Sequence, residues 1–405
     1  MMNRMMALVL ALSLMLMLSG CDEKAEASSV SQETASSAAS VSSSVSADIP
    51  AEEETVLPLL SSDNGERVYV LEGSRQDNIW STRYYWINED RMLLFRKENA
   101  QAERSALLFD HDTNLVRTVS NAPVELSYDN QYSTDATGIH FFMEDGVLRH
   151  YDQDLNFLGE TTFLQQRNKF DCALDFQSET LYYLENGDLY QEQNGKVQLL
   201  AELPESADHS FSHALELSDD KKHLIFRTAV YEAQNTDSLL DYNLETGTLT
   251  KLTDDIFDPQ IGWVKGQPLI YTYGEDAERT VTSVRYGYEQ TDVLQFVRFK
   301  DNVLYEESLN MDMQHGICLI YTRRWKEQPT QYRIACIRED GSYFIYHGEH
   351  ARNDLICYPS LSPDQSHLSF IIAEEEILTL HLVPTEGLWQ PLDWNALQQE
   401  LFPKN

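Results

Sequence analysis

Seven segments of the chain share one pattern of apolar and polar positions. Each has an aliphatic residue and, two positions later, an aromatic one, so both side chains point to the same face of a strand. Two copies, Ser218–Phe226 and Ser362–Phe370, also share Ser at position one, Asp at three and His at six. The frames begin at 87, 133, 175, 218, 263, 313 and 362, in steps of 42 to 50 residues, which indicates a repeat array. The apolar pairs are Leu93/Phe95, Ile139/Phe141, Leu181/Tyr183, Leu224/Phe226, Leu269/Tyr271, Leu319/Tyr321 and Leu368/Phe370.

The residue between the two members of the pair is apolar as well in five copies. A strand that is apolar on both faces is covered on both sides, as in small sheets stacked face to face around an axis. Each frame follows another apolar segment and precedes a strand, a tight turn and a strand. Examples of the last unit are 239–252, 332–346 and 377–392, with Gly at the turn. The five residues are Leu94, Tyr182, Ile225, Ile270 and Ile320.

Four strands in about 45 residues is the repeat of a β-propeller. We therefore predict an all-β protein whose residues 56–395 form seven four-stranded blades, with eight or six blades as alternatives. The strand expected at Glu66–Leu71 either belongs to an extra sheet or, the preferred interpretation, closes the ring beside the last blade. Residues 396–405 complete a short C-terminal helix and tail, with Trp394, Leu397 and Leu401 on one side.

The N-terminus has the pattern of an export signal. A charged start precedes an apolar run from Met5 to Leu18, too short to span a membrane comfortably, and small residues follow. The sequence Leu18-Ser19-Gly20-Cys21 resembles a bacterial lipobox, which implies a signal peptide over residues 1–20 and a lipidated Cys21. The alternative is an ordinary secretory signal with an incidental cysteine. The following residues up to 55 are rich in Ser, Ala and Glu and are predicted to be a disordered tether. Such tethers resemble those of Gram-positive surface lipoproteins, so we expect a membrane-anchored, extracytoplasmic protein.

The charge of the chain narrows the range of partners. Acidic residues outnumber basic ones 66 to 30, for a formal net charge of −36. This field repels nucleic acids and anionic lipid head groups, so nucleic-acid binding is excluded. It favours solubility outside the cell and, more specifically, cations or basic partners.

The turn Ser362-Pro363-Asp364 and the hairpin at 239–253 resemble the TolB-like, Pro-Asp type of propeller repeat. The consensus of that repeat continues with Gly and Lys, and this chain has Gln365 or Lys221 at the Gly position. Proline presets φ at the first central turn position, and the Asp carboxylate accepts hydrogen bonds from the following amides. The resemblance implies a propeller and, as one functional reading, an assembly factor for envelope proteins.

Four cysteines remain after the anchor. Cys318 and Cys336 lie in consecutive predicted strands that face each other across a hairpin, so a disulfide is feasible in an oxidising compartment. Two small buried thiols are the alternative.

Metal sites have weak candidates only. Asp110–Asn114 and Asp152–Asn156 have the Asp-x-Asp-x-Asn spacing that can begin a calcium loop, but the Gly and Glu that should follow are missing, which favours Asx turns. The pairs His209/His213 and His347/His350 are expected in connectors on the channel face. Two imidazoles and a carboxylate can hold a transition metal, although solvated loop histidines are the default. No metal and no cofactor is expected.

A cationic group with an aromatic platform is the main candidate for binding. Arg323, Arg324, Trp325 and Lys326 are expected in a loop of the sixth blade, on the same face as the connector with His347, His350 and Arg352. This combination suits an anionic group, a sugar ring or an acidic partner segment. Rim salt bridges are the alternative explanation.

The sequence contains no nucleophile elbow, no zinc-protease helix signature and no glycine-rich phosphate loop, which argues against an enzymatic function. The preferred hypothesis is a non-enzymatic binding or scaffold module for a protein or glycan partner in the envelope. The alternative is a metal-assisted glycan lyase or hydrolase built on the channel face.

Overall fold

The computed structural model describes residues 54–61, 65–71, 82–96, 105–119, 131–143, 145–164, 172–185, 188–203, 215–229, 237–256, 259–275, 278–299, 305–313, 315–325, 328–351, 355–374 and 377–402. The predicted signal peptide, Cys21 and the predicted tether up to residue 53 lie outside these ranges.

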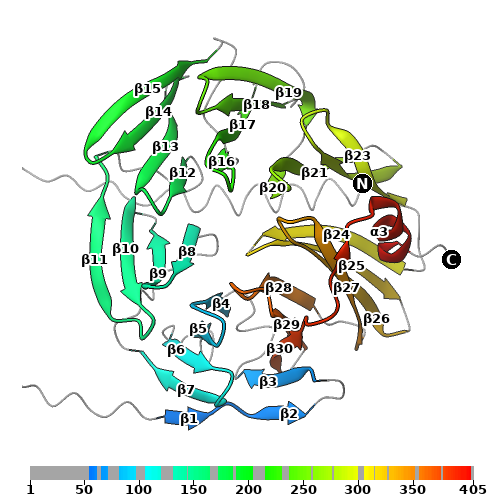
Figure 1. The fold of residues 1–405 in the computed structure, drawn as a ribbon. Coiled ribbons are helices and arrows are strands. Elements are labelled where there is room, and N and C mark those ends of the chain that lie inside the picture. The colour runs from blue at the N-terminus through cyan, green and yellow to red at the C-terminus, as the bar shows by residue number, and fades with distance from the viewer. Residues whose placement is uncertain are drawn as a thin grey trace, which may run out of the picture. The chain divides into compact units, whose positions relative to one another are not determined.

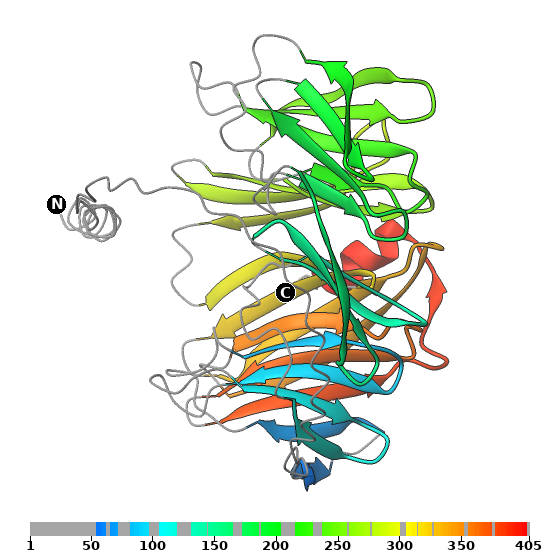
Figure 2. The same cartoon turned by 90° about the vertical axis from the view of Figure 1, so that its left-hand side faces the viewer.

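The described strands form seven antiparallel sheets arranged in a ring (Figure 1). Each sheet is one blade, with four strands in order from the centre outward and, in three blades, a fifth strand on the outer edge. Seen from the side, the strands run roughly along the ring axis (Figure 2). The predicted seven-bladed, all-β propeller is therefore confirmed.

The blades follow one another along the chain. Blade 1 contains β4 (Arg83–Trp86), β5 (Arg91–Arg96), β6 (Ser105–Asp110) and β7 (Leu115–Thr118); blade 2 contains β8 (Gln131–Asp135), β9 (Gly138–Phe142), β10 (Val147–Asp152) and β11 (Phe157–Thr162); blade 3 contains β12 (Cys172–Asp175), β13 (Thr180–Glu185), β14 (Asp188–Gln193) and β15 (Lys196–Glu202). Blade 4 contains β16 (Leu215–Leu217), β17 (His223–Ala229), β18 (Asp237–Asn243) and β19 (Thr248–Ile256); blade 5 contains β20 (Gln260–Val264), β21 (Gln267–Glu275), β22 (Arg279–Tyr286) and β23 (Thr291–Phe299). Blade 6 contains β24 (Tyr305–Met313), β25 (Ile317–Trp325), β26 (Thr330–Ile337) and β27 (Ser342–His350); blade 7 contains β28 (Leu355–Leu361), β29 (His367–Ala373), β30 (Leu378–Pro384) and β3 (Arg67–Leu71).

The repeated apolar pair lies on the second strand of every blade, and all fourteen of its residues are buried. The residue between them is buried too, even where it is His140 or Ser369. This double burial arises because each blade packs against a neighbour on both faces. Seven apolar clusters, one between each pair of adjacent blades, complete the circle.

The ring is closed by the N-terminal strand β3. It pairs antiparallel with β30 of the last blade, from Arg67 opposite Leu382 to Leu71 opposite Leu378. Tyr69 of β3 is fully buried, packs edge-on against Phe109 of blade 1 and donates to Asn114 Oδ1 at 2.7 Å. The expectation that Glu66–Leu71 closes the ring beside the last blade is thus confirmed, and the extra-sheet alternative is wrong.

The hairpin predicted over 377–392 is wrong. After β30 ends at Pro384, the chain turns and forms β31 (Gln390–Pro391), which pairs with β27 of blade 6. The edge of β30 that this segment would have occupied is already taken by β3. The hairpins at 239–252 and 332–346 are present as β18–β19 and β26–β27.

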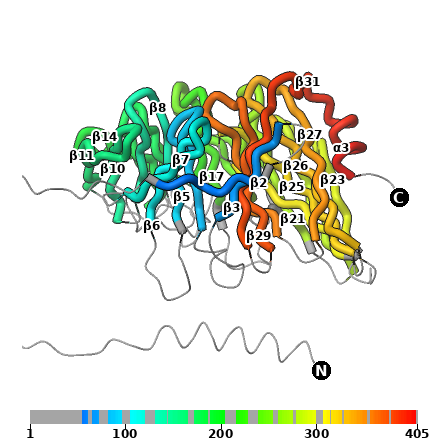
Figure 3. Tube along the Cα trace, turned by 90° about the horizontal axis from the view of Figure 1, so that it is seen from below, coloured from blue at the N-terminus to red at the C-terminus, as the bar shows by residue number. Residues whose placement is uncertain are grey.

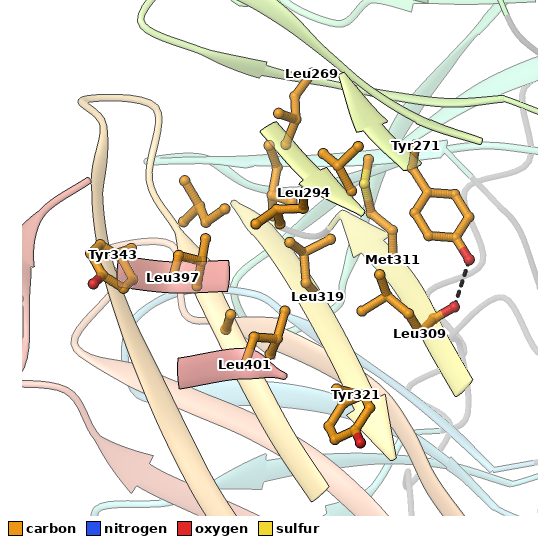
Figure 4. Packing of buried hydrophobic residues seen from close by; sticks show 14 of the residues in the cluster. Leu269, Tyr271, Leu294, Leu309, Met311, Leu319, Tyr321, Tyr343, Leu397 and Leu401 are labelled. Atoms are coloured by element: carbon orange, nitrogen blue, oxygen red, sulfur yellow. Dashed lines mark hydrogen bonds between the residues drawn. The ribbon is translucent and has the colours of Figure 1, made fainter. Parts of the chain in front are cut away.

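The ends of the chain also cover the outer edges of several blades. β1 (Glu54–Val56) pairs with β7, and β2 (Leu59–Ser61) pairs with β3, so the N-terminal segment runs along the rim of blades 1 and 7 (Figure 3). The helix α3 (Trp394–Leu401) begins at the N-cap Asp393. Its buried Leu397 and Leu401 join the cluster between blades 5 and 6 (Figure 4). Within the described ranges, no helix is long and apolar enough to cross a membrane.

The polar turn of the repeat has a defined hydrogen-bond pattern. The Ser218 hydroxyl donates to Asp220 Oδ1 at 2.7 Å and accepts from the amide of His223 at 2.9 Å, and Ser362 does the same with Asp364 and His367. Position four of the frame is left-handed in both copies, with φ of 61° at Lys221 and 60° at Gln365. Glycine adopts this conformation without steric cost.

Replacing Lys221 with Gly should therefore stabilise the propeller. Relief of the left-handed strain outweighs the extra entropy of an unfolded Gly by about 0.5 kcal/mol. Urea unfolding of the full-length protein would measure the gain in the free energy of unfolding.

Lys222→Gly is the matched control, because Lys222 does not have positive φ and its ammonium pairs with Glu245 at 2.9 Å. This substitution should lower the free energy of unfolding by about 0.5–1 kcal/mol. Equal losses in both variants would show that the strain at Lys221 is not relieved by Gly.

Candidate functional site

The two ends of the ring differ in the length of their connections. At one end, where second strands end and fourth strands lead to the next blade, the connections include 72–82, 119–130 and 203–214. At the other end no connection between described strands is longer than the five-residue turns at 218–222 and 362–366. We name these the long-connection end and the short-turn end. Long surface connections on a rigid scaffold are where recognition residues concentrate.

The predicted cationic patch lies at the long-connection end, but on a strand rather than in a loop. Arg323, Arg324 and Trp325 are the last residues of β25, which extends further than the repeat frame suggested. Lys326 and Arg352 lie outside the described residues.

Arg323 is a buried structural residue. Its side chain is only 6% exposed, its Nε lies 3.2 Å from Glu307 Oε1, and its guanidinium stacks 4.3 Å from the Trp325 ring. The same carboxylate accepts the Tyr321 hydroxyl at 2.6 Å. A guanidinium held by an ion pair and an aromatic face is not available to a ligand. The alternative explanation, a salt bridge, therefore applies to Arg323, and its partner is Glu307.

Strand geometry divides the rest of the patch. Successive side chains of a strand point to opposite faces. Leu319 and Tyr321 join the cluster with blade 5, whereas Cys318 and Ile320 join the cluster with blade 7. Arg324 therefore points to the opposite face of β25 from Arg323, and the patch is not one continuous surface.

The two histidines of blade 6 are also in a strand, β27, and not in the expected connector. Being three residues apart, they face opposite sides. His347 is exposed, accepts at Nδ1 from Arg333 Nε (3.2 Å) and contacts Glu400 of α3 through Nε2 (3.2 Å). His350 stacks on Tyr332, whose hydroxyl lies 2.8 Å from its Nε2. Burial, with a smaller effect of His381, lowers the pKa of His350 to about 4. These histidines cannot share a metal, and His209 and His213 lie outside the described residues.

A cleft of about 290 Å³ opens on the outer strands of blade 6 at the long-connection end. The Tyr332 ring lies across Gly348 so closely that a Cβ atom there would come within 2.0 Å of it. The hydrogen-bonded series Arg333–His347–Glu400 ties β26, β27 and α3 together beside it. Arg333 was missed by the sequence reasoning because it stands alone in the sequence. The cleft is lined by Gln331, Tyr332, Arg333, His347, Gly348 and Glu349.

One group in the described part of the chain, Asp90, His111 and Asp112, has the spacing of metal ligands. Both nitrogens of the buried His111 are already used. Nδ1 accepts from Arg67 Nη2 at 3.0 Å, so Nε2 carries the proton and donates to the Glu89 carbonyl at 2.8 Å. Since neither nitrogen offers a lone pair, His111 is a structural residue rather than a ligand.

The two calcium-like runs form local turns. Asp110 Oδ1 accepts from the amide and hydroxyl of Thr113, and Asp152 Oδ1 accepts from the amides of Asp154 and Asn156. These are the Asx turns expected as the alternative to calcium.

Cys318 and Cys336 are directly opposite each other on β25 and β26, fully buried, with 3.7 Å between their sulfur atoms. The structure holds them as free thiols in contact. A disulfide has an S–S length of about 2.05 Å, so forming one needs a small approach of the two side chains. The bridge stays a prediction.

Sequence reasoning also missed an Asp–His pair at the short-turn end. Nδ1 of His223 lies 3.0 and 3.1 Å from the two carboxylate oxygens of Asp241. His223 was noticed only as position six of the repeat, and its partner is eighteen residues away on the next strand.

Comparison with known proteins finds the fold only. No family model and no curated protein matches the chain. Among solved structures, the Dos1 propeller is 11% identical, with a TM-score of 0.44 and coverage of 78% of this chain and 96% of that one. The β-propeller domain of Cps50 (Swd1) from Myceliophteria thermophila is 11% identical, with a TM-score of 0.43 and coverage of 78% and 98%. An oligogalacturonate lyase from Vibrio parahaemolyticus is 11% identical, with a TM-score of 0.32 and coverage of 83% and 99%. Such identities carry no information on substrate or activity.

The buried pairing predicts unequal effects of two adjacent substitutions. Arg323→Ala should lower the free energy of unfolding by about 3 kcal/mol, because it leaves Glu307 without its cation and uncovers Trp325. Arg324→Ala, on the other face, should cost less than about 1 kcal/mol. Thermal and urea unfolding of both variants would measure this. Similar small losses would mean that the Arg323–Glu307 pair contributes little.

Proposed function

We propose that this protein is a lipid-anchored, extracytoplasmic binding module whose propeller presents its long-connection end to a protein or glycan partner in the cell envelope. The observation that carries the proposal is the contrast between the two ends. Connections of up to twelve residues, such as 203–214, gather at one end, and only turns of five residues or fewer join the strands at the other. Length beyond what strand pairing needs is used for recognition in many scaffolds.

The cleft on blade 6 is a second reason to propose the long-connection end as the binding face, because it opens at that end. It combines the Tyr332 ring with the polar groups of Gln331, Arg333, His347 and Glu349, a mixture suited to a polar ligand or a peptide segment. Arg333 gives it one cationic group in a chain with a net charge of −36.

Binding is favoured over the metal-assisted lyase or hydrolase by the arrangement of three described histidines, His347, His350 and His111. A catalytic metal needs imidazole and carboxylate groups that converge on one point. His347 and His350 face opposite sides of β27, and His111 has no free nitrogen. A shaped surface is sufficient for a binder.

The anchor rests on the lipobox-like Leu18-Ser19-Gly20-Cys21. Cys21→Ser should abolish incorporation of a radiolabelled fatty acid and move the protein from the membrane fraction to the soluble or secreted fraction. Fractionation of the two strains would measure this, with Cys172→Ser as a control that removes a thiol but should stay membrane-bound. Membrane retention of Cys21→Ser would contradict lipid anchoring.

The binding face can be located with a photo-crosslinking residue placed at single positions of the anchored protein. At Gln331, exposed at the long-connection end, we expect a covalent adduct of defined mass after irradiation of intact cells. At Glu386, exposed in the turn after β30 at the short-turn end, we expect none.

Equal adducts at both positions would show non-specific proximity. An adduct at Glu386 alone would place the partner at the other end and overturn the assignment of the face. Digestion of the Gln331 adduct with protease or with glycan hydrolases would distinguish a protein partner from a glycan.

A further inference from the structure

The interface between blades 4 and 5 has the fewest buried apolar residues of the seven clusters found in the described part of the chain. Its fully apolar part consists of Ile225, Leu239, Ile261 and Ile270 beside Trp263. Towards the short-turn end it becomes polar, where His223 of β17, Asp241 of β18 and Tyr288 of the β22–β23 turn meet. This place is on the far side of the ring from the long-connection end.

His223 presents one nitrogen to this place. Its Nδ1 is used by the Asp241 carboxylate, so with a neutral ring Nδ1 donates and Nε2 keeps a lone pair. Nε2 has no hydrogen-bond partner among the described residues. The His223 side chain is 20% exposed and Asp241 8%, so the pair is reached from solvent through the imidazole.

Two aromatic residues enclose the imidazole and bring unsatisfied polar atoms. The ring centroids of Trp263 and Tyr288 lie 6.4 and 5.3 Å from that of His223. Trp263 is 8% exposed. Its Nε1, the Tyr288 hydroxyl and Oε1 of Gln290 in the same turn as Tyr288 are all buried, and none has a hydrogen-bond partner in the described structure. Leaving buried polar atoms unpaired costs about 1–3 kcal/mol each, so such a group calls for a partner.

The propeller contains an internal comparison. Between blades 7 and 1, His367 occupies the same frame position as His223, and its ring lies 6.5 Å from that of Trp86. A third ring, His111, takes the place of Tyr288 at 4.9 Å from His367. There Trp86 Nε1 donates to the Ser369 hydroxyl at 2.9 Å, and both nitrogens of His111 are bonded.

The interface between blades 4 and 5 lacks those partners. The residue at the frame position of Ser369 is Ile225, which cannot accept from Trp263. In the interface between blades 7 and 1, the polar atoms of these rings thus have partners within the protein. In the interface between blades 4 and 5, Trp263 Nε1 and the Tyr288 hydroxyl have none in the described structure. Packing alone does not require this difference.

We propose that the blade 4–5 interface binds a small ammonium compound that also carries a hydroxyl oxygen, an amino alcohol in chemical class. The ammonium N–H groups satisfy acceptors such as His223 Nε2 and the Tyr288 oxygen, and the hydroxyl oxygen accepts from Trp263 Nε1. The aromatic faces of Trp263 and Tyr288 attract the cation.

The electrostatics of the place suit a cation. The carboxylate of Asp241 lies behind the imidazole, and burial followed by the charges of Asp241 and Asp220 raises the pKa of Tyr288. Both carboxylates therefore act on the phenol oxygen. A neutral diol can make the same hydrogen bonds but gains nothing from this field.

The test uses three probes on the full-length protein at 0.3 M salt, which screens weak attraction to the acidic surface: ethanolamine, ethylammonium without the hydroxyl, and ethylene glycol without the charge. Ligand-observed NMR titration should give a dissociation constant in the millimolar range for ethanolamine. Binding should be several-fold weaker for ethylammonium and undetectable for ethylene glycol.

Tyr288→Phe, which keeps the ring and removes one acceptor, should weaken ethanolamine binding about tenfold, and so should Asp241→Asn, which removes the charge behind His223. The matched control is Tyr190→Phe, which removes a hydroxyl from blade 3 and should leave the dissociation constant unchanged.

Three results would overturn the proposal. Unchanged binding in Tyr288→Phe and Asp241→Asn would place the cation elsewhere on the acidic surface. Equal binding of ethylene glycol would show that charge is not recognised. Absence of binding by all three probes would show that the unpaired polar atoms do not form a ligand site. None of these results affects the partner at the long-connection end, which the crosslinking tests separately.

Discussion

The propeller depends on closing the circle. Each second strand is apolar on both faces, so no blade can bury its surface without a neighbour on each side, and the first and last blades must meet. They meet through β3, whose Tyr69 packs against blade 1 while its backbone pairs with β30 of blade 7. The closing strand is preceded directly by β1 and β2, which cover the edges of blades 1 and 7. The N-terminal segment from β1 to β3 is therefore also the part that closes the ring.

Polar groups reinforce this closure. The Glu66 carboxylate, just before β3, accepts from Tyr346 of blade 6 at 3.0 Å and contacts His381 of blade 7 at 2.7 Å. His381 is 7% exposed, and its other nitrogen lies 3.0 Å from the Thr379 hydroxyl. A buried network of this kind is costly unless every member is paired. Because Glu66 bonds to side chains of both blade 6 and blade 7, the network fixes the position of β3 relative to these two blades. Apolar contacts, which have no preferred direction, specify this position less tightly.

The repeat period and the apolar pair were enough to predict the architecture, because burial on both faces leaves few alternatives to stacked blades. They failed where a strand partner comes from far away in sequence. The sequence of the segment after β30 is typical of a fourth strand, but β3 pairs with the edge of β30 that this segment would need, and β31 pairs with β27 instead. The candidate patch failed for a different reason. Arg323 and Arg324 are adjacent in sequence, yet β25 continues to Trp325 and sends them to opposite faces. The Asp–His pair at blade 4 needed the register of β17 and β18, which no local pattern reveals.

The repeat also shows where such a fold can vary. The apolar positions are constrained by packing on both faces, because a substitution there changes the contacts with the blades on both sides. The polar position that begins the second strand lies at the short-turn end and contacts side chains of the adjacent blade, so its surroundings differ from copy to copy. His223 and His367 keep the same place in the frame, but one faces Asp241 and unpaired aromatic groups, and the other faces paired His111 and Trp86. Where Ser369 accepts from the Trp86 indole, the corresponding residue of blade 4 is Ile225, which has no acceptor to offer the Trp263 indole.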